Sequence, residues 1–250
     1  MGNRMVGRKP GRFRKKIMFR FKQFNVYQEN SAMKVCTDSC LFGALICPDK
    51  PVHALDIGTG TGLLSLMLAQ RYPALTIDAV ELEPGAASDA RRNFSESPFG
   101  SRLQLHECAI QDFAKEKRPA YDLIFCNPPF YEDRLKSPHR HKNIAHHAAE
   151  LSFRELARIS SQLLSSDGTL WILLPPFEMT RFTREAGANA LHLKECHTLR
   201  HRTDKPVFRE VAVFSRPAST LPVTREIIIY ENDKYSSIFA TLLRDYYLIF

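Results

Sequence analysis

The most specific chemical signal in the sequence is a tetrapeptide that follows a short apolar segment: Asn127, Pro128, Pro129 and Phe130. An exocyclic amine on an aromatic ring is a poor nucleophile, because its lone pair is delocalised into the ring. The Asn127 side-chain oxygen and the Pro128 backbone oxygen can accept its two N–H groups and draw them out of that conjugation. The fixed φ of proline holds the Pro128 carbonyl rigidly, and Phe130 can stack on the ring. The tetrapeptide therefore predicts group transfer to a planar amine.

A glycine-rich segment predicts a turn that binds a small molecule. Gly58, Gly60 and Gly62 allow a tight turn and a close approach of the backbone to a ligand. Their spacing differs from the G-x-G-x-x-G fingerprint of dinucleotide-binding proteins. Asp56, just before the first glycine, opposes a pyrophosphate but suits an ammonium group. Glu81 ends the next apolar segment, where a carboxylate can accept hydrogen bonds from both ribose hydroxyls.

Parallel strands must bring these residues to one edge of a sheet. From Pro51 onward, short apolar segments alternate with helical ones, which predicts an α/β fold with helices on both faces of the sheet. Two successive strands with no helix between them predict one antiparallel strand in a mostly parallel seven-stranded sheet. The strands are expected at 52–58, 76–82, 102–110, 121–126, 169–176, 191–201 and 207–216, with a possible edge strand at 224–231. The helices are expected at 62–72, from Pro84, and at 150–165, 177–190 and 235–250, and Asp167-Gly168 is expected to form a turn.

Positive charge gathers near the amino end of the chain. The net charge is +8 over 250 residues, and the first acidic residue is Glu29. Residues 1–24 are therefore expected to form a basic, flexible arm that meets a polyanion, followed by a single folded domain at 25–250. A solubilising tail is the alternative. The aromatic residues that interleave with these charges can stack on bases: Phe13, Phe19, Phe21 and Phe24.

Composition excludes several other classes of protein. No apolar run reaches the roughly 18 residues that a membrane span needs, and no secretory signal is evident, so we expect a soluble, cytoplasmic protein. The six cysteines lack C-x-x-C pairs and are expected to be reduced core thiols. Cys126, although it adjoins the tetrapeptide, is not expected to be a nucleophile. Four histidines in the loop at 131–148 lack metal-ligand partners, so no metal is expected and contact with phosphate or base is favoured: His139, His141, His146 and His147.

These motifs resemble those of a known family. The D-x-G-x-G-x-G pattern from Asp56 to Gly62 is similar to the first motif of class I S-adenosylmethionine-dependent methyltransferases, whose fold is Rossmann-like. Residues 19–250 as a whole resemble the bacterial tRNA1(Val) (adenine(37)-N6)-methyltransferases. The segments that carry this resemblance are FRFKQFNVYQENSAMKVCTDSCLFGAL, ALDIGTGTGLLSLMLAQR, DAVELEP, NPPF and SIFATLLRDYYL.

The resemblance implies methyl transfer from S-adenosylmethionine to the N6 of an adenine in tRNA, at adenine 37 of tRNA1(Val). It places Lys34, Thr37 and Asp38, which belong to the Lys-Val-x-Thr-Asp part of the opening segment, over the cofactor. It also implies that tRNA meets the basic arm and the loop at 131–148. We expect a monomer.

The sequence departs from the family at two positions. Ala109 stands where the family often has an acid for the cofactor adenine, and His146 stands where arginine is expected. Asp112 is the candidate to replace the acid, with helix capping as an equal alternative.

Related functions remain as alternatives. Asn-Pro-Pro followed by an aromatic residue also serves enzymes that methylate guanine N2 in ribosomal RNA or glutamine in a protein. The glutamine enzymes carry an N-terminal helical domain for which the arm is too short. The glycine spacing opposes an NAD-dependent oxidoreductase, and an RNA-binding module without activity would not bind S-adenosylmethionine.

Overall fold

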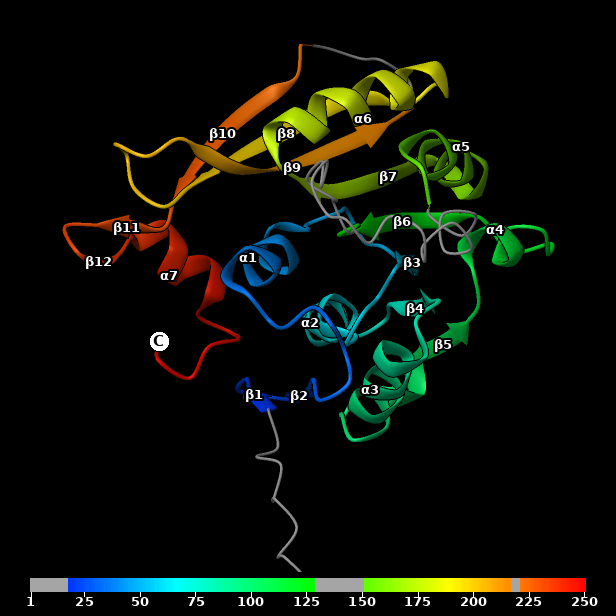
Figure 1. The fold of residues 1–250 in the computed structure, drawn as a ribbon, viewed down its shortest axis with the longest axis horizontal. Coiled ribbons are helices and arrows are strands. Elements are labelled where there is room, and N and C mark those ends of the chain that lie inside the picture. Colours follow the sequence, from blue (N-terminus) through cyan, green and yellow to red (C-terminus); the bar gives the residue numbers. More distant parts are fainter. Residues whose placement is uncertain (1–17, 129–150, 217–220) are drawn as a thin grey trace, which may run out of the picture.

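A central sheet of eight strands forms the body of the protein (Figure 1). The computed structural model describes residues 18–128, 151–216 and 221–250. The strands follow the order β10-β8-β9-β7-β6-β3-β4-β5 across the sheet. Their bounds are His53–Ile57 (β3), Thr76–Glu81 (β4), Leu103–Glu107 (β5), Tyr121–Cys126 (β6), Leu164–Leu174 (β7), His192–Arg200 (β8), Val207–Ser215 (β9) and Val223–Ile228 (β10).

The predicted α/β class and its antiparallel strand are confirmed, but the predicted number of strands is wrong. β9 runs antiparallel to both β7 and β8, and every other pair in the sheet is parallel. The eighth strand is β10, which corresponds to the possible edge strand predicted at 224–231 and pairs in parallel with β8 at the edge of the sheet. Most of its side chains are exposed and only Ile227 is buried, so its apolar pattern in the sequence is short.

Helices cover both faces of the sheet (Figure 1). Successive side chains of a strand point to opposite faces of the sheet, so the sheet has a separate hydrophobic core on each face. In β6, Leu123 and Phe125 face one core, while Ile124 and Cys126 face the other. The first core includes residues of α1 (Thr37–Leu45), α2 (Leu63–Arg71), α3 (Pro84–Ser95) and α7 (Ser237–Leu243). The second core includes residues of α4 (Ile110–Phe113), α5 (Phe153–Leu163) and α6 (Pro176–Ala188).

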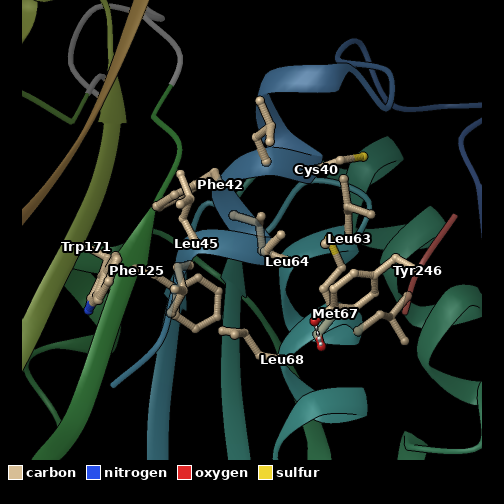
Figure 2. Close-up of a cluster of buried hydrophobic side chains, with 14 of the residues drawn as sticks. Cys40, Phe42, Leu45, Leu63, Leu64, Met67, Leu68, Phe125, Trp171 and Tyr246 are labelled. Atoms are coloured by element: carbon tan, nitrogen blue, oxygen red, sulfur yellow. Dashed lines mark hydrogen bonds between the residues drawn. The ribbon is translucent and has the colours of Figure 1, made fainter. Parts of the chain in front are cut away.

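The packing of α1 on α2 sets the position of the glycine turn. Figure 2 shows side chains of both helices meeting above Phe125 and Trp171 of the sheet. The helices approach closely at Gly43, where a Cβ would lie 2.6 Å from the Met67 sulfur. Because α2 begins directly after Gly62, this contact also places the start of α1 relative to the turn.

The amino-terminal residues that the structure describes belong to the fold, so the predicted arm boundary at residue 24 is wrong. β1 (Met18–Arg20) pairs antiparallel with β2 (Asn25–Tyr27). Phe21 and Phe24 are each only 4% exposed and stack on each other with ring centroids 4.6 Å apart. Phe19 is partly buried against the same core, and the buried Phe21 and Phe24 rings are not available to stack on bases. Residues 1–17, including Phe13, lie outside the described residues.

Two predicted elements differ from the structure near the carboxyl half. The closing helix α7 is shorter than the predicted 235–250, and it begins after Ser236, whose Oγ accepts a hydrogen bond from the Phe239 N–H at 3.1 Å. The predicted Asp167-Gly168 turn lies inside β7, where the pairing with β6 shifts register. Three short elements complete the described chain: η1 (Gly100–Arg102), β11 (Tyr230–Glu231) and β12 (Lys234–Tyr235).

The six cysteines are free, as predicted, but only Cys40 and Cys126 are buried. Cys36 and Cys47 are exposed, so the prediction that all six are core thiols is wrong. In the parts of the chain that the structure describes, no helix is long and apolar enough to cross a membrane.

Candidate active site

The candidate site lies where three parallel strands end side by side. Ile57 at the end of β3 pairs with both Val80 of β4 and Cys126 of β6. The residues that follow these three positions therefore emerge at one edge of the sheet. They include the glycine turn after β3, Glu81 at the end of β4, and Asn127 and Pro128 after β6.

The glycine turn has two distinct parts. Gly58, Gly60 and Gly62 adopt left-handed φ angles of 72°, 59° and 81°, which favour glycine. A Cβ at Gly58 or Gly60 would find open space, so these residues face a volume in which a ligand can approach the backbone. A Cβ at Gly62 would lie 2.4 Å from the Phe94 ring of α3. The third glycine is therefore required by helix packing and not by close approach to a ligand.

Asp56 is completely buried beneath this turn. Its Oδ2 accepts hydrogen bonds from the Thr59 hydroxyl at 2.6 Å and the Ser65 hydroxyl at 2.7 Å. Its Oδ1 is buried and has no hydrogen-bond partner among the described residues. Burial raises the pKa of this carboxyl to about 7, and repulsion from Glu81 adds to the effect. Neither hydroxyl was predicted, although both residues lie in the motif segment and its helix.

Glu81 stabilises the turn through the backbone. Its Oε2 accepts a hydrogen bond from the Gly60 N–H at 2.8 Å, and its Oε1 accepts one from the Glu83 N–H, also at 2.8 Å. Each carboxylate oxygen can accept a further hydrogen bond. The neighbouring Glu83 caps α3 by accepting from the Gly85 and Ala86 N–H groups.

Asn127 holds a buried acceptor at the end of β6. Its Oδ1 is buried and has no hydrogen-bond partner in the part of the chain that the structure describes. Buried polar atoms are nearly always hydrogen-bonded, so this acceptor is available to a hydrogen-bond donor of a ligand that binds at the end of β6. The neighbouring Pro128 is also buried. Phe130, the four histidines and the loop at 131–148 lie outside the described residues.

The segment before α1 is braced by the protein itself. Lys34 Nζ donates to the backbone oxygens of Gln28 and Ser31, the latter at 2.7 Å. Thr37 is exposed as the first residue of α1. Asp38 accepts a hydrogen bond from Arg209 Nε at 3.1 Å, which links α1 to β9 across the chain. The contribution of Arg209 was not predicted, because nothing local in the sequence marks the pair.

Asp112 is exposed in the first turn of α4 and pairs with Lys115 at 2.7 Å. The N-cap of α4 is Ala109, so the alternative role of Asp112 as the capping residue is wrong. Among the described residues, no cluster of three or more histidine, cysteine or acidic side chains is placed to hold a metal ion.

The sequence of this chain is similar to those of known methyltransferases. Residues 39–182 match the family described as methyltransferase small domain. A tRNA1(Val) (adenine(37)-N6)-methyltransferase from Dyadobacter fermentans is 44% identical over 236 residues, covering 93% of this chain and 98% of the relative. A protein of the same name from Cytophaga hutchinsonii is 42% identical over 233 residues, covering 92% and 97% of the two chains.

A solved structure supports the fold assignment. The structure of a predicted O-methyltransferase from Agrobacterium tumefaciens superposes with a TM-score of 0.64 at 16% identity. The match covers 83% of this chain and 96% of the other. At this identity the likeness concerns the fold alone.

Proposed function

The chain belongs to the methyltransferase small domain family, and from its relatives and its site we propose that it methylates the N6 of adenine in tRNA, at adenine 37 of tRNA1(Val). One observation carries the chemical part of the proposal. The buried, unpartnered Oδ1 of Asn127 stands beside Pro128 at the carboxyl end of β6. Ligands of open α/β sheets bind at this edge.

The residues of the glycine turn fit S-adenosylmethionine, the methyl donor of this class of enzyme. The unpartnered Asp56 Oδ1 is an acceptor for a cationic ammonium group, and the open space at Gly58 and Gly60 leaves room beside the backbone. Glu81 retains acceptor capacity for ribose hydroxyls while it holds Gly60. Bound there, S-adenosylmethionine supplies a methyl group that is already activated by its sulfonium sulfur.

In the proposed mechanism, Asn127 and Pro128 make the target amine nucleophilic. The Asn127 Oδ1 and the Pro128 carbonyl oxygen accept the two N–H groups of the amine and turn its lone pair out of the ring. With the cofactor bound, the amine nitrogen would form a bond to the methyl carbon while the bond from that carbon to the sulfonium sulfur breaks, so that S-adenosylhomocysteine leaves. The methylated nitrogen would then release one proton to water. Phe130 holds the adenine ring by stacking. Positioning supplies most of the acceleration, since no covalent enzyme intermediate is needed.

The remaining proposed contacts surround this centre. Lys34, Thr37 and Asp38 line the cofactor from the segment before α1, and Asp112 approaches the cofactor adenine. We further propose that tRNA meets the basic residues within 1–17 and the loop at 131–148, and that the protein acts as a monomer in the cytoplasm.

Methylation of a defined substrate tests the function. Purified protein is incubated with unmodified tRNA1(Val) and S-adenosylmethionine that carries a labelled methyl group, and the RNA is digested to nucleosides for mass spectrometry. Labelled N6-methyladenosine is expected, and it should vanish when adenine 37 is replaced by guanine. Ribosomal RNA and a glutamine-containing protein substrate are offered in parallel reactions. An unlabelled tRNA together with label in N2-methylguanosine of the ribosomal RNA or in protein glutamine would overturn the proposal in favour of the related enzymes.

A further inference from the structure

We propose that Phe177 and Arg181 form a docking site for the RNA strand that flanks the target nucleotide. The Phe177 ring stacks on a neighbouring base, and the Arg181 guanidinium meets a phosphate. The inference rests on the proposed function, because it takes the partner to be the tRNA loop that carries the target adenine.

The position of Phe177 at the rim of the active site is set by the sheet. β7 is the neighbour of β6, and Ile172 of β7 pairs with Cys126, the residue before Asn127. The chain then continues past Leu174 into Pro175 and Pro176, where α6 begins. Phe177 therefore stands in the first turn of α6, one strand away from the acceptor at Asn127.

Phe177 is the outer end of a series of ring contacts that starts in the core. Phe214 and Phe182 are fully buried with ring centroids 5.4 Å apart, and Phe182 meets Phe153 at 5.7 Å. The Arg181 guanidinium carbon lies 5.9 Å from the Phe153 ring and 6.0 Å from the Phe177 ring. Phe177 itself is 68% exposed. Phe177 is therefore an exposed aromatic ring that contacts the core rings through Arg181.

The charge around Phe177 favours an anionic partner. Arg181 and Arg184 follow Phe177 at helical spacing, so the three side chains share one face of α6. Both arginines are exposed, and no carboxylate of the described residues forms an ion pair with either. A cation with an adjacent exposed ring suits single-stranded RNA, in which phosphates alternate with unstacked bases.

A single exposed phenylalanine is ordinary on a protein surface and would carry no inference alone. Here the ring coincides with two arginines that no described carboxylate neutralises, and with the edge of the sheet that holds Asn127. Glu178 and Glu185 also lie on α6, but neither forms an ion pair with Arg181 or Arg184 in the part of the chain that the structure describes, so both guanidinium groups remain available to phosphates. Charge complementarity thus selects RNA as the occupant.

Binding measurements on full-length variants test the docking site. The anisotropy of a labelled stem-loop carrying the target adenine is followed over a range of salt concentrations for wild type, Phe177→Ala, Phe177→Trp and Arg181→Ala. Matched controls are Lys194→Ala and Val223→Ala, whose exposed side chains stand in the amino-terminal halves of β8 and β10, at the opposite edge of the sheet. The affinity for S-adenosylmethionine is measured for each variant as a check on folding.

Phe177→Ala should weaken RNA binding by about 5- to 150-fold, and Phe177→Trp should restore it, since any aromatic face can stack. Arg181→Ala should flatten the log–log salt dependence by about 0.7 for each phosphate that the variant no longer binds. The controls and the cofactor affinity should stay at wild-type values. Wild-type RNA affinity in both Phe177→Ala and Arg181→Ala would overturn the inference, as would loss of a dimer on Phe177→Ala in sedimentation. If the wild-type enzyme methylates adenine while both variants bind RNA with wild-type affinity, this inference is wrong and the proposed function stands.

Discussion

Glu81 accepts a hydrogen bond of 2.8 Å from the backbone N–H of Gly60, which ties the end of β4 to the turn after β3. The same carboxylate is the proposed partner of the cofactor ribose. The side chain that holds the turn in this shape is thus also the one proposed to contact the ligand. Such preorganisation lowers the cost of ordering the site on binding.

Glu81→Ala and Asp56→Ala should each weaken S-adenosylmethionine binding by about 1.5–3 kcal/mol, the usual worth of a hydrogen bond to a charged group. Titration calorimetry measures the affinity. Glu116→Ala removes an exposed carboxylate paired with Arg118 and serves as the control. Unchanged cofactor affinity in both site variants would contradict the assigned roles.

The pKa of Asp56 predicts a pH-dependent stability. Burial raises this pKa to about 7, whereas an aspartate in the unfolded chain titrates near 4. Between these values the native protein binds a proton that the unfolded chain has lost, so raising the pH lowers the free energy of unfolding. Relative to Asp56→Asn, the cofactor-free wild type should lose stability from about pH 4 to about pH 7 and then level off. Urea unfolding over this range measures the difference, and a difference that is constant or grows with pH would refute the assignment.

Alanine at Gly60 and at Gly62 should have different effects. Both positions have left-handed φ angles, which cost an alanine about 1–2 kcal/mol. Only Gly62→Ala must also displace the Phe94 ring, so its melting temperature should fall further. Gly60→Ala should instead mainly reduce cofactor affinity, because the new methyl group enters the open side of the turn, where the ligand is proposed to bind. Thermal scans with and without S-adenosylmethionine compare the two, and equal melting temperatures for the two variants would contradict the distinction.

The order of elements and the glycine turn were predictable because their signals are local. A strand that runs into closely spaced glycines and then a helix marks the turn, and Asn127 follows an apolar strand in the same way. The contacts that complete the site are not local in this sense. Asp38 and Arg209 are 171 residues apart in the chain, and their pairing depends on how α1 packs beside β9.

The boundary of the amino-terminal arm shows how a charge pattern can mislead. Lys22 lies in a basic run, yet its Nζ donates to the backbone oxygens of Arg244 at 2.6 Å and Phe250 at 2.7 Å. Phe21 and Phe24 beside it are buried in the core. Composition alone predicts an arm here, because it does not show that Lys22 contacts Arg244 and Phe250 at the other end of the sequence.

Deletion of residues 1–17 should weaken tRNA binding and leave cofactor affinity nearly unchanged, because this segment carries much of the net positive charge. The deletion ends before β1, and the cofactor affinity of the shortened protein checks that it is folded. The slope of log affinity against log salt should fall by about 0.7–0.9 for each phosphate that the shortened protein no longer binds. Filter binding across a salt series provides the measurement, and an identical slope for both proteins would show that the segment does not contact RNA.

The central claim is that Asn127 activates the target amine. Because its acceptor acts chiefly as the amine approaches the methyl group, Asn127→Ala should slow methyl transfer by about a hundred- to a thousandfold, or roughly 2.7–4 kcal/mol, while cofactor and RNA affinities barely change. The matched control is Asn189→Ala, because Asn189 lies at the carboxyl end of α6, away from the candidate site. The decisive measurement is the single-turnover rate of labelled methyl transfer to unmodified tRNA1(Val), with N6-methyladenosine identified as the product. A large loss of rate with intact binding is expected, and a near-normal single-turnover rate for Asn127→Ala would contradict the account.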